Sequence, residues 1–252
     1  MRTVYKVILS KIGVNRSVAT IFRYAPKSMN GLGLPHIFID QGCSQIKSLL
    51  SHINTKTKLG GTMSAQLESC SIELGSTRHM FTLRYDKWSH ILTNCWTNNI
   101  WKFADLYSIN LKGDYSRPHP LRERDIGTMD IIIENNFEAI SNETLRTLNR
   151  CRLYLQIVTL ADILDVDGVN IDPLINSLET RIDRKSSWVW PEQVRPLKNE
   201  WTTWLKMVEE ILEPYIYNIQ GLGNWIKTPH QRFQWKYSPT LDTFYFDNGT
   251  ND

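Results

Sequence analysis

The sequence predicts a mainly α-helical protein, an irregular multi-helix domain that ends in a β-hairpin. Apolar residues recur at helical spacing in several segments between residues 41 and 212. Near the C-terminus, residues 232–246 instead alternate between apolar and polar on both sides of a Ser-Pro pair, as two antiparallel strands would. The chain has 252 residues, of which 41% are hydrophobic and 22% charged. This ordinary globular composition excludes a collagen-like or wholly disordered chain.

The helical pattern starts after the turn sequence Gly-Leu-Gly-Leu-Pro at residues 31–35. Between residues 41 and 53 the apolar side chains share one face, and Asp40 is a candidate N-cap for this helix. After a polar loop, Thr62 is the candidate cap of a second helix, which Gly75 is expected to end.

A tryptophan-containing segment follows. Residues 80–85 are expected to be extended. The apolar spacing between residues 88 and 104 then indicates two short helices, or one bent helix, that insert Trp88, Trp96 and Trp101 into a core. We interpret these rings as core residues because an aromatic stripe at helical spacing is typical of a buried face.

The polar segment 109–124, which has two prolines two positions apart, is the expected internal boundary. It divides the chain into a basic N-terminal arm and helical subdomain, residues 1–115, and a helical subdomain with a Trp-rich C-terminal hairpin, residues 116–252. In the second part, helices are expected over residues 125–134 and from Ser141 to about residue 163.

The sequence of residues 165–168, Asp-Val-Asp-Gly, is like the opening of a calcium loop. No liganding residue follows at the later positions and no Glu closes the loop, so a turn is the better interpretation. Further on, Pro196 is expected to start a helix in which Trp201 and Trp204 share a face, and Pro214 is expected to follow its end.

The sequence contains no catalytic or cofactor-binding signature. It lacks an Asp-Asp pair, a glycine-rich phosphate loop and a Gly-X-Ser-X-Gly elbow, and its four cysteines form no Cys-X-X-Cys motif. We therefore expect no cofactor, no metal site and no catalytic residue of a known motif. Whether the chain is an enzyme stays open, because distant carboxylates can still meet in a pocket.

No apolar run reaches the roughly 18 residues that a membrane-spanning helix needs, so no membrane association is expected. The N-terminus also lacks the apolar core and the small-residue cleavage site of a secretion signal. A nuclear or cytoplasmic location is therefore expected instead of secretion.

Charge is distributed unevenly along the chain. Residues 1–67 hold nine Lys and Arg but a single Asp, which gives a net charge of +8, whereas the rest of the chain has a net charge of −5. A basic arm attracts phosphates by releasing counterions, but it can also lie against acidic surface of its own chain. The cations of this arm that we expect to contact nucleic acid are Lys11, Arg16, Arg23 and Lys27.

Three arginines lie close together at residues 146, 150 and 152. On a helix Arg146 and Arg150 share a face, whereas Arg152 points about 160° away from Arg150, so the three cannot form one patch. We expect phosphate contact from Arg146 and Arg150, and a structural pair with a carboxylate for at least one of the three.

A basic and then aromatic segment provides the other candidate contacts. In it Lys185 precedes Trp188 and Trp190, which lie on one face if the chain is extended. Such rings can stack on unpaired bases. A buried strand with two core tryptophans has the same pattern, so both interpretations stay open.

Several strings occur along the chain in a fixed order: GLGLP at 31–35, QG at 41–42, QI at 45–46, LLSH at 49–52, LNRCRLYLQ at 148–156, WP at 190–191 and PHQ at 229–231, followed by Trp235. In this order they resemble the region that follows the reverse-transcriptase palm in polyproteins of non-long-terminal-repeat retroelements of diatoms and other protists or fungi. The resemblance covers nearly the whole chain, and the LNRCRLYLQ string is its most specific part.

This resemblance implies a non-catalytic, thumb-and-connection-like part of a retrotransposon RNA-directed DNA polymerase. The paired catalytic aspartates of the family precede the region matched here, so no catalytic residue is carried over. The implied partners are RNA and DNA, as an RNA–DNA hybrid, and the remainder of the polyprotein. The alternative is a helical protein–protein interaction module of unrelated descent, with a Trp-rich groove for a partner helix.

Overall fold

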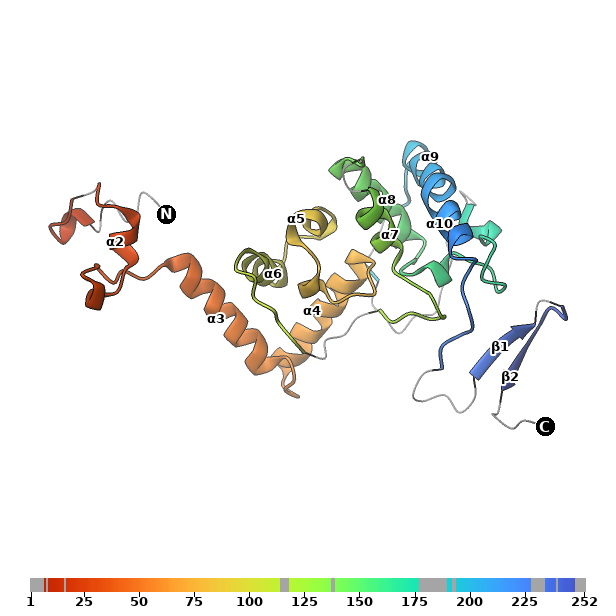
Figure 1. Ribbon diagram of the computed structural model, residues 1–252, viewed down its shortest axis with the longest axis horizontal. Helices are drawn as coiled ribbons and strands as arrows, with labels where there is room; N and C mark the ends of the chain where they lie inside the picture. The colour runs from red at the N-terminus through yellow and green to blue at the C-terminus, as the bar shows by residue number, and fades with distance from the viewer. Residues whose placement is uncertain are drawn as a thin grey trace. The chain divides into compact units, whose positions relative to one another are not determined.

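The computed structural model describes residues 7, 9–15, 17–113, 118–136, 139–176, 190–191, 194–227, 234–238 and 240–247. Within these residues the elements are helices, apart from two strands near the C-terminus and a few isolated bridges (Figure 1). The mainly α fold with a C-terminal β-hairpin is therefore confirmed. Backbone contacts divide the chain into unit 1, residues 1–51, and unit 2, residues 52–252, which we describe separately.

Unit 1 contains the helix α2 (Thr20–Tyr24), the 3-10 turn η1 (Lys27–Met29) and nearly all of α3 (Ile37–His52). The predicted turn at residues 31–34 folds back on α2, because the backbone N–H of Leu32 donates to the Phe22 carbonyl at 2.8 Å. Gly31 is required there, since a Cβ at this position would lie 2.0 Å from the Ala25 carbonyl oxygen.

The N-terminal ends of two helices differ from the sequence prediction. Asp40 lies in the first turn of α3 and is not its N-cap, because the helix begins directly after Pro35-His36. The next helix, α4 (Lys58–Leu74), starts before Thr62, because Thr57 is its N-cap and accepts the Gly60 N–H at 3.1 Å. Its end is as predicted, since Gly75 terminates α4 with a φ of +61°.

The remaining elements of unit 2 are α5 (Tyr85–Trp88), α6 (Trp96–Leu106), α7 (Thr128–Asn136), α8 (Asn142–Tyr154), α9 (Lys198–Met207), the π-helical turn η6 (Val208–Leu212), α10 (Glu213–Asn218), β1 (Gln234–Ser238) and β2 (Thr243–Asp247). The 3-10 turns are η2 (Met80–Thr82), η3 (Ser89–Ile91), η4 (Leu160–Asp162) and η5 (Pro173–Asn176). No helix in the described ranges combines the length and the apolar content that crossing a membrane requires.

Three predicted features of unit 2 need correction. Residues 80–85 are not a strand: η2 and the start of α5 occupy them, and this conformation buries both Met80 and Leu83. The helix from Ser141 ends at Tyr154 and not near residue 163, because Gln156 adopts a left-handed φ of +59°. Pro214 does not follow the end of a helix but lies in the first turn of α10, directly after η6.

The C-terminal segment forms the predicted antiparallel hairpin, and its register places Trp235 opposite Phe246 and Tyr237 opposite Phe244. At the turn, the Tyr237 hydroxyl donates to the Asp242 carboxylate at 2.7 Å. The alternation of apolar and polar residues thus predicted both strands.

Tryptophans form much of the core of unit 2. Trp88, Trp101, Trp201 and Trp204 are buried, which confirms the interpretation of these rings as core residues. The Trp101 indole N–H donates to the Leu83 carbonyl at 2.8 Å, so its polar atom is satisfied inside the core. Trp96 is only half-buried.

Arg152 lies at the centre of unit 2 with no exposed surface. Its guanidinium donates to Asn149 Oδ1, to the Ile157 carbonyl at 2.5 Å, and to the carbonyls of Ile72 and Glu73 at 2.7 and 2.9 Å. Ile72 and Glu73 are in the last turn of α4, where carbonyls have no partner within the helix. Arg152 therefore joins α8, the chain that follows it and the end of α4.

Residues on both sides of the predicted boundary at residue 115 belong to unit 2, and residues 114–117 lie outside the described part. The following segment contacts the end of α4, because the Met129 N–H donates to the Gly75 carbonyl at 3.2 Å. In addition, the buried Asp130 accepts the Ser76 hydroxyl at 2.7 Å and the Arg78 guanidinium at 3.0 Å. A polar segment with prolines thus lies within one unit.

We predict that Arg152→Met lowers the free energy of unfolding by more than about 4 kcal/mol, because it leaves several buried acceptors without a donor. Arg152→Lys is expected to cost nearly as much, since an ammonium group cannot replace the planar guanidinium. Urea unfolding followed by circular dichroism measures both changes.

The matched control is Arg146→Met on the same helix. Arg146 is exposed and donates from Nε to the His90 carbonyl, so its loss is expected to cost at most about 1 kcal/mol. Equal losses for Arg146→Met and Arg152→Met would contradict the central role of Arg152.

Candidate nucleic-acid interface

The predicted cations of unit 1 are solvent-accessible where the structure describes them. Lys11 and Lys27 are exposed, and neither forms an ion pair with any described residue. Arg23 is half-buried, and its Nε donates to the Val18 carbonyl at 3.0 Å. Arg16 lies outside the described residues.

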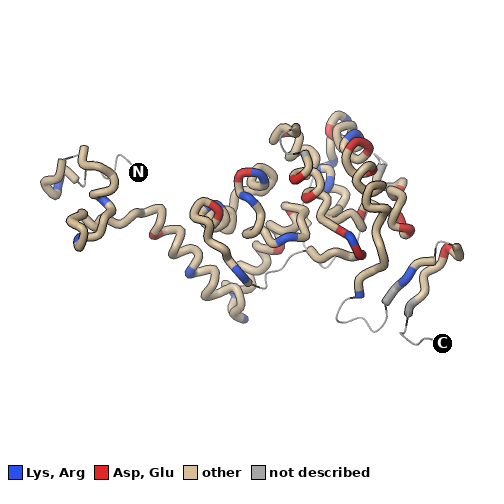
Figure 2. The backbone as a smooth tube through the Cα atoms, viewed as in Figure 1, with Lys and Arg blue, Asp and Glu red and all other residues tan. Residues whose placement is uncertain are grey.

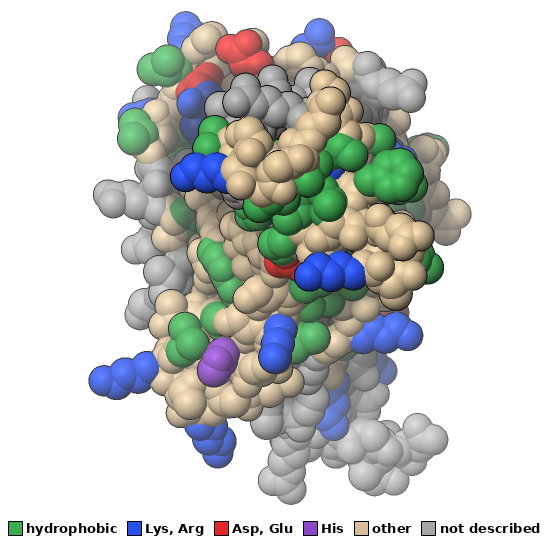
Figure 3. All heavy atoms as spheres, turned by 90° about the vertical axis from the view of Figure 1, so that its left-hand side faces the viewer, with side chains coloured by type: hydrophobic (Ala, Val, Ile, Leu, Met, Phe, Trp, Pro, Cys, Tyr) green, Lys and Arg blue, Asp and Glu red, His purple; other side chains and the backbone are tan. Residues whose placement is uncertain are grey.

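The charge of unit 1 is almost entirely positive. Asp40 is the single carboxylate of residues 1–51, and the tube of α2 and α3 is correspondingly poor in red in Figure 2. Lys and Arg side chains on the face drawn in Figure 3 stand singly, with hydrophobic side chains between them. Ile21 and Met29, for example, are 73% and 72% exposed. The described lysines of this unit, Lys11, Lys27 and Lys47, are thus available to an anion.

Arg146 and Arg150 lie on one face of α8, as predicted, and both line a cavity of about 360 Å³. The cavity is bounded by Glu73 of α4, by the turn at residues 90–93 and by Pro191. Arg146 Nε donates to the His90 carbonyl at 2.9 Å, which fixes its side chain against this turn.

Carboxylates around this cavity partly neutralise the positive charge of the two arginines. Arg150 Nη2 lies 2.5 Å from Glu200 Oε1, so this guanidinium has a carboxylate partner. Glu73 and Glu143 also line the cavity. A phosphate entering here would meet carboxylates as well as cations, so this cavity is a weaker anion site than its two arginines indicate.

The basic and aromatic segment is described only in part. Lys185 and Trp188 lie outside the described residues. Trp190 is half-buried, and its indole N–H is buried without a hydrogen-bond acceptor among the described residues. A half-buried ring is compatible with both interpretations, so base stacking by Trp190 stays a prediction.

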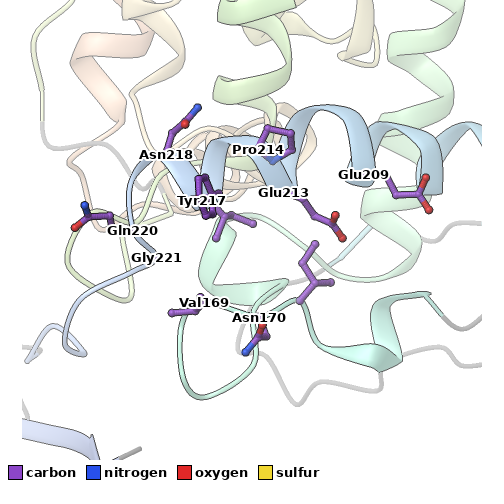
Figure 4. A pocket seen from close by; sticks show the side chains of 11 residues that line it. Val169, Asn170, Glu209, Glu213, Pro214, Tyr217, Asn218, Gln220 and Gly221 are labelled. Carbon is purple, nitrogen blue, oxygen red and sulfur yellow. The ribbon is translucent and has the colours of Figure 1, made fainter.

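A larger groove of about 1020 Å³ lies between α10 with the preceding π-helical turn and the loop at residues 169–171. Figure 4 shows Glu213, Pro214 and Tyr217 projecting from the helix, with Val169 and Asn170 on the facing loop. No Lys or Arg occurs among the described residues that line it. The groove is therefore not suited to phosphate.

Arg122 holds the two walls of this groove together. It is 5% exposed and donates to the Gly223 carbonyl at 2.8 Å and to the Val166 carbonyl at 3.0 Å. Its guanidinium also lies 5.0 Å from the centre of the Trp225 ring. Gly168 packs against it, since a Cβ there would lie 2.6 Å from Arg122 Nη2.

Arg122 lies in the polar segment that the sequence pattern marks as an internal boundary. Its carbonyl partners are 44 and 101 residues away in the chain, so no local pattern marks it. The turn at residues 165–168 is confirmed, because the Asp167 carboxylate accepts the backbone N–H groups of Val169 and Asn170. In the part of the chain that the structure describes, no group of three His, Cys, Asp or Glu is placed to hold a metal ion.

Arg122→Met is expected to lower the free energy of unfolding by about 2–4 kcal/mol, because two carbonyls lose their charged donor. It should also speed hydrogen exchange in residues 165–171 and 219–225, the segments that contain its two carbonyl acceptors and continue into the two walls. Arg84→Met is the control, since Arg84 is exposed and pairs only with Asp86 in the described structure. Unchanged exchange in both walls would show that Arg122 does not hold them.

The structure thus places the predicted cations in two settings, the exposed lysines of unit 1 and the partly neutralised cavity beside α8. Comparisons of the chain with protein-family models, with curated proteins and with solved structures found no match in any of the three. What the chain does is therefore inferred from its own residues.

Proposed function

We propose that the chain is a non-catalytic, thumb-and-connection-like part of a retroelement reverse transcriptase, and that the lysines of unit 1 contact the phosphates of a template–primer duplex. The ordered strings of the sequence support the descent. The contact is supported by Lys11, Lys27 and Lys47, which are exposed and form no ion pair within the described part of the chain.

The observation that carries the proposal is the charge of unit 1. Residues 1–51 contain seven Lys and Arg and one Asp. Lysines that are exposed and have no carboxylate partner can neutralise the phosphates of a polyanion. The polyanion then releases the cations condensed on it, and this release contributes to the affinity. Scattered cations favour contact with a phosphate backbone over recognition of a base sequence.

The most specific string of the resemblance has a structural role. Residues 148–156 include Asn149 and Arg152, which form the buried network between α8 and α4. The string therefore supports a shared fold and not a shared binding site. Arg146 remains a candidate phosphate contact, whereas Arg150 would have to leave Glu200 to become one.

The test is a filter-binding titration of the full chain with an RNA–DNA hybrid over a range of salt concentrations. In a triple variant with Lys11→Gln, Lys27→Gln and Lys47→Gln, the salt slope should fall by about 1 for each lysine that contacts a phosphate. The affinity itself should fall with little dependence on the hybrid's sequence.

The control is a triple variant of unit 2 with Lys112→Gln, Lys198→Gln and Lys227→Gln. These side chains are also exposed, so both triples lose the same net charge from the surface. The control should keep most of the affinity. Absence of binding, a flat salt slope or an equal effect of both triples would refute the proposal.

A second candidate function, a protein–protein interaction module, is favoured by the groove at α10. Tyr217 is 84% exposed and Val169 is 53% exposed, so two large apolar side chains face solvent at the groove. Glu209 and Glu213 lie beside them, which suits a partner segment that carries Lys or Arg. No tryptophan is among the described lining residues, so the groove is not the Trp-rich one that the sequence suggested.

Tyr217→Ser separates the two functions. If the groove binds a protein partner, this variant should lose a partner that wild type retains in a pull-down after nuclease treatment. Tyr245→Ser on the hairpin is the control, because Tyr245 is also exposed. The interaction module would be excluded by two results together. Wild type would retain no partner after nuclease treatment, and Tyr217→Ser would lose binding to the hybrid.

A further inference from the structure

The fold brings together two cysteines that are 25 residues apart in the chain. Cys70 lies in α4, Cys95 is the N-cap residue of α6, and their sulfur atoms are 3.6 Å apart. Cys70 is 3% exposed, whereas Cys95 is half-buried and therefore the more exposed of the two. The sequence has no close cysteine pair, so only the fold reveals this dithiol.

The two thiols differ in acidity. The hydrogen bond with Cys70 lowers the pKa of Cys95 to about 6, and the backbone N–H groups of Asn98 and Thr97 at the start of α6 add to this effect. Burial and the Glu73 carboxylate act in the opposite direction. The hydrogen bond with Cys95 and burial raise the pKa of Cys70. This difference favours Cys95 as the thiolate and the buried Cys70 as the hydrogen-bond donor.

The other two cysteines lack this arrangement. Cys43 is exposed, and the structure pairs it with no other cysteine. Cys151 is buried, and its thiol donates to the Glu200 carbonyl at 3.7 Å. Burial raises the pKa of Cys151 to about 12, which keeps it a thiol. These residues serve as internal references for the pair.

We propose that Cys70 and Cys95 form a redox site that a low-molecular-weight disulfide, such as oxidised glutathione, converts to an intramolecular disulfide. The Cys95 thiolate attacks one sulfur of the small disulfide and releases one thiolate, which leaves a mixed disulfide on Cys95. The Cys70 thiol gives its proton to solvent, its sulfur bonds to the Cys95 sulfur, and the second small thiolate leaves.

The two cysteines are together oxidised by two electrons, and the small disulfide is reduced to two thiols. The product would tie α4 to the first turn of α6 and to the turn before it. That turn lines the cavity beside Arg146, where the Thr93 N–H donates to the Glu73 carboxylate at 2.8 Å. Oxidation would therefore fix one wall of this cavity, whether or not the chain binds nucleic acid.

The test treats the reduced full chain with oxidised glutathione, blocks the remaining thiols with iodoacetamide and digests the protein with trypsin. Cleavage after Lys and Arg places Cys70 in the peptide 59–78 and Cys95 in the peptide 88–102. Mass spectrometry should find these two peptides joined by a disulfide. Cys43, in the peptide 28–47, should remain available to the alkylating reagent or to glutathione.

Two variants control the experiment. Cys43→Ser should form the same crosslink as wild type, whereas Cys70→Ala should stop at glutathione attached to Cys95. Wild type that keeps glutathione on Cys95 without forming the crosslink would overturn the proposal. A crosslink that appears only after the protein is unfolded would also overturn the proposal.

A second measurement does not depend on forming the disulfide. In the reduced protein, the rate at which iodoacetamide modifies Cys95 should rise with pH and reach half of its plateau near pH 6. In Cys70→Ala this midpoint should move to higher pH, because the thiolate loses a hydrogen-bond donor. An unchanged midpoint would show that Cys70 does not contact Cys95, which would refute the site.

Discussion

The fold of unit 2 depends on a buried arginine whose partners are mostly backbone carbonyls. Burial lowers the pKa of Arg152 to about 9, so the guanidinium is still charged at neutral pH. Burying such a charge costs free energy unless the N–H groups of the guanidinium donate to acceptors inside the protein. Here the end of α4, Asn149 and the chain after α8 supply the acceptors. Because one side chain donates hydrogen bonds to three segments, the positions of these segments constrain one another.

Much of the local structure follows from this constraint. Gly75 has no side chain because a Cβ would lie 2.6 Å from the Arg152 guanidinium carbon. The chain turns out of the helix after Tyr154, so that the Ile157 carbonyl faces the same guanidinium. Residue 159 then lies beside Gly127 in an isolated antiparallel bridge. The sequence predicted that at least one arginine here would pair with a carboxylate. Arg150 does so with Glu200, whereas Arg152 binds backbone carbonyls and Asn149 instead.

Sequence reasoning succeeded where the relevant signal is local. Helical spacing identified the faces that bury Trp201 and Trp204, and alternation identified the hairpin. It failed where a distant partner decides the outcome. The neutralisation of Arg150 by Glu200 and the approach of Cys70 to Cys95 both require the tertiary fold. The misplaced cap at Thr62 is a local error, because Thr57, five residues earlier, caps the helix instead.

The cations of this chain also differ in their partners: several arginines of unit 2 have fixed partners from distant segments, whereas the lysines of unit 1 are exposed to solvent. In unit 2, Arg78 pairs with Asp130 and Glu134, Arg122 binds carbonyls and a tryptophan ring, and Arg152 is enclosed. Planar guanidinium groups suit such fixed partners, whereas a lysine ammonium is more strongly hydrated and more often stays in solvent. Residues 1–51 contain a single carboxylate that could neutralise the charge of the exposed lysines of unit 1. The exposed lysines of unit 1 therefore suit the phosphate contact that we propose, whereas Arg78, Arg122 and Arg152 stabilise the fold of unit 2.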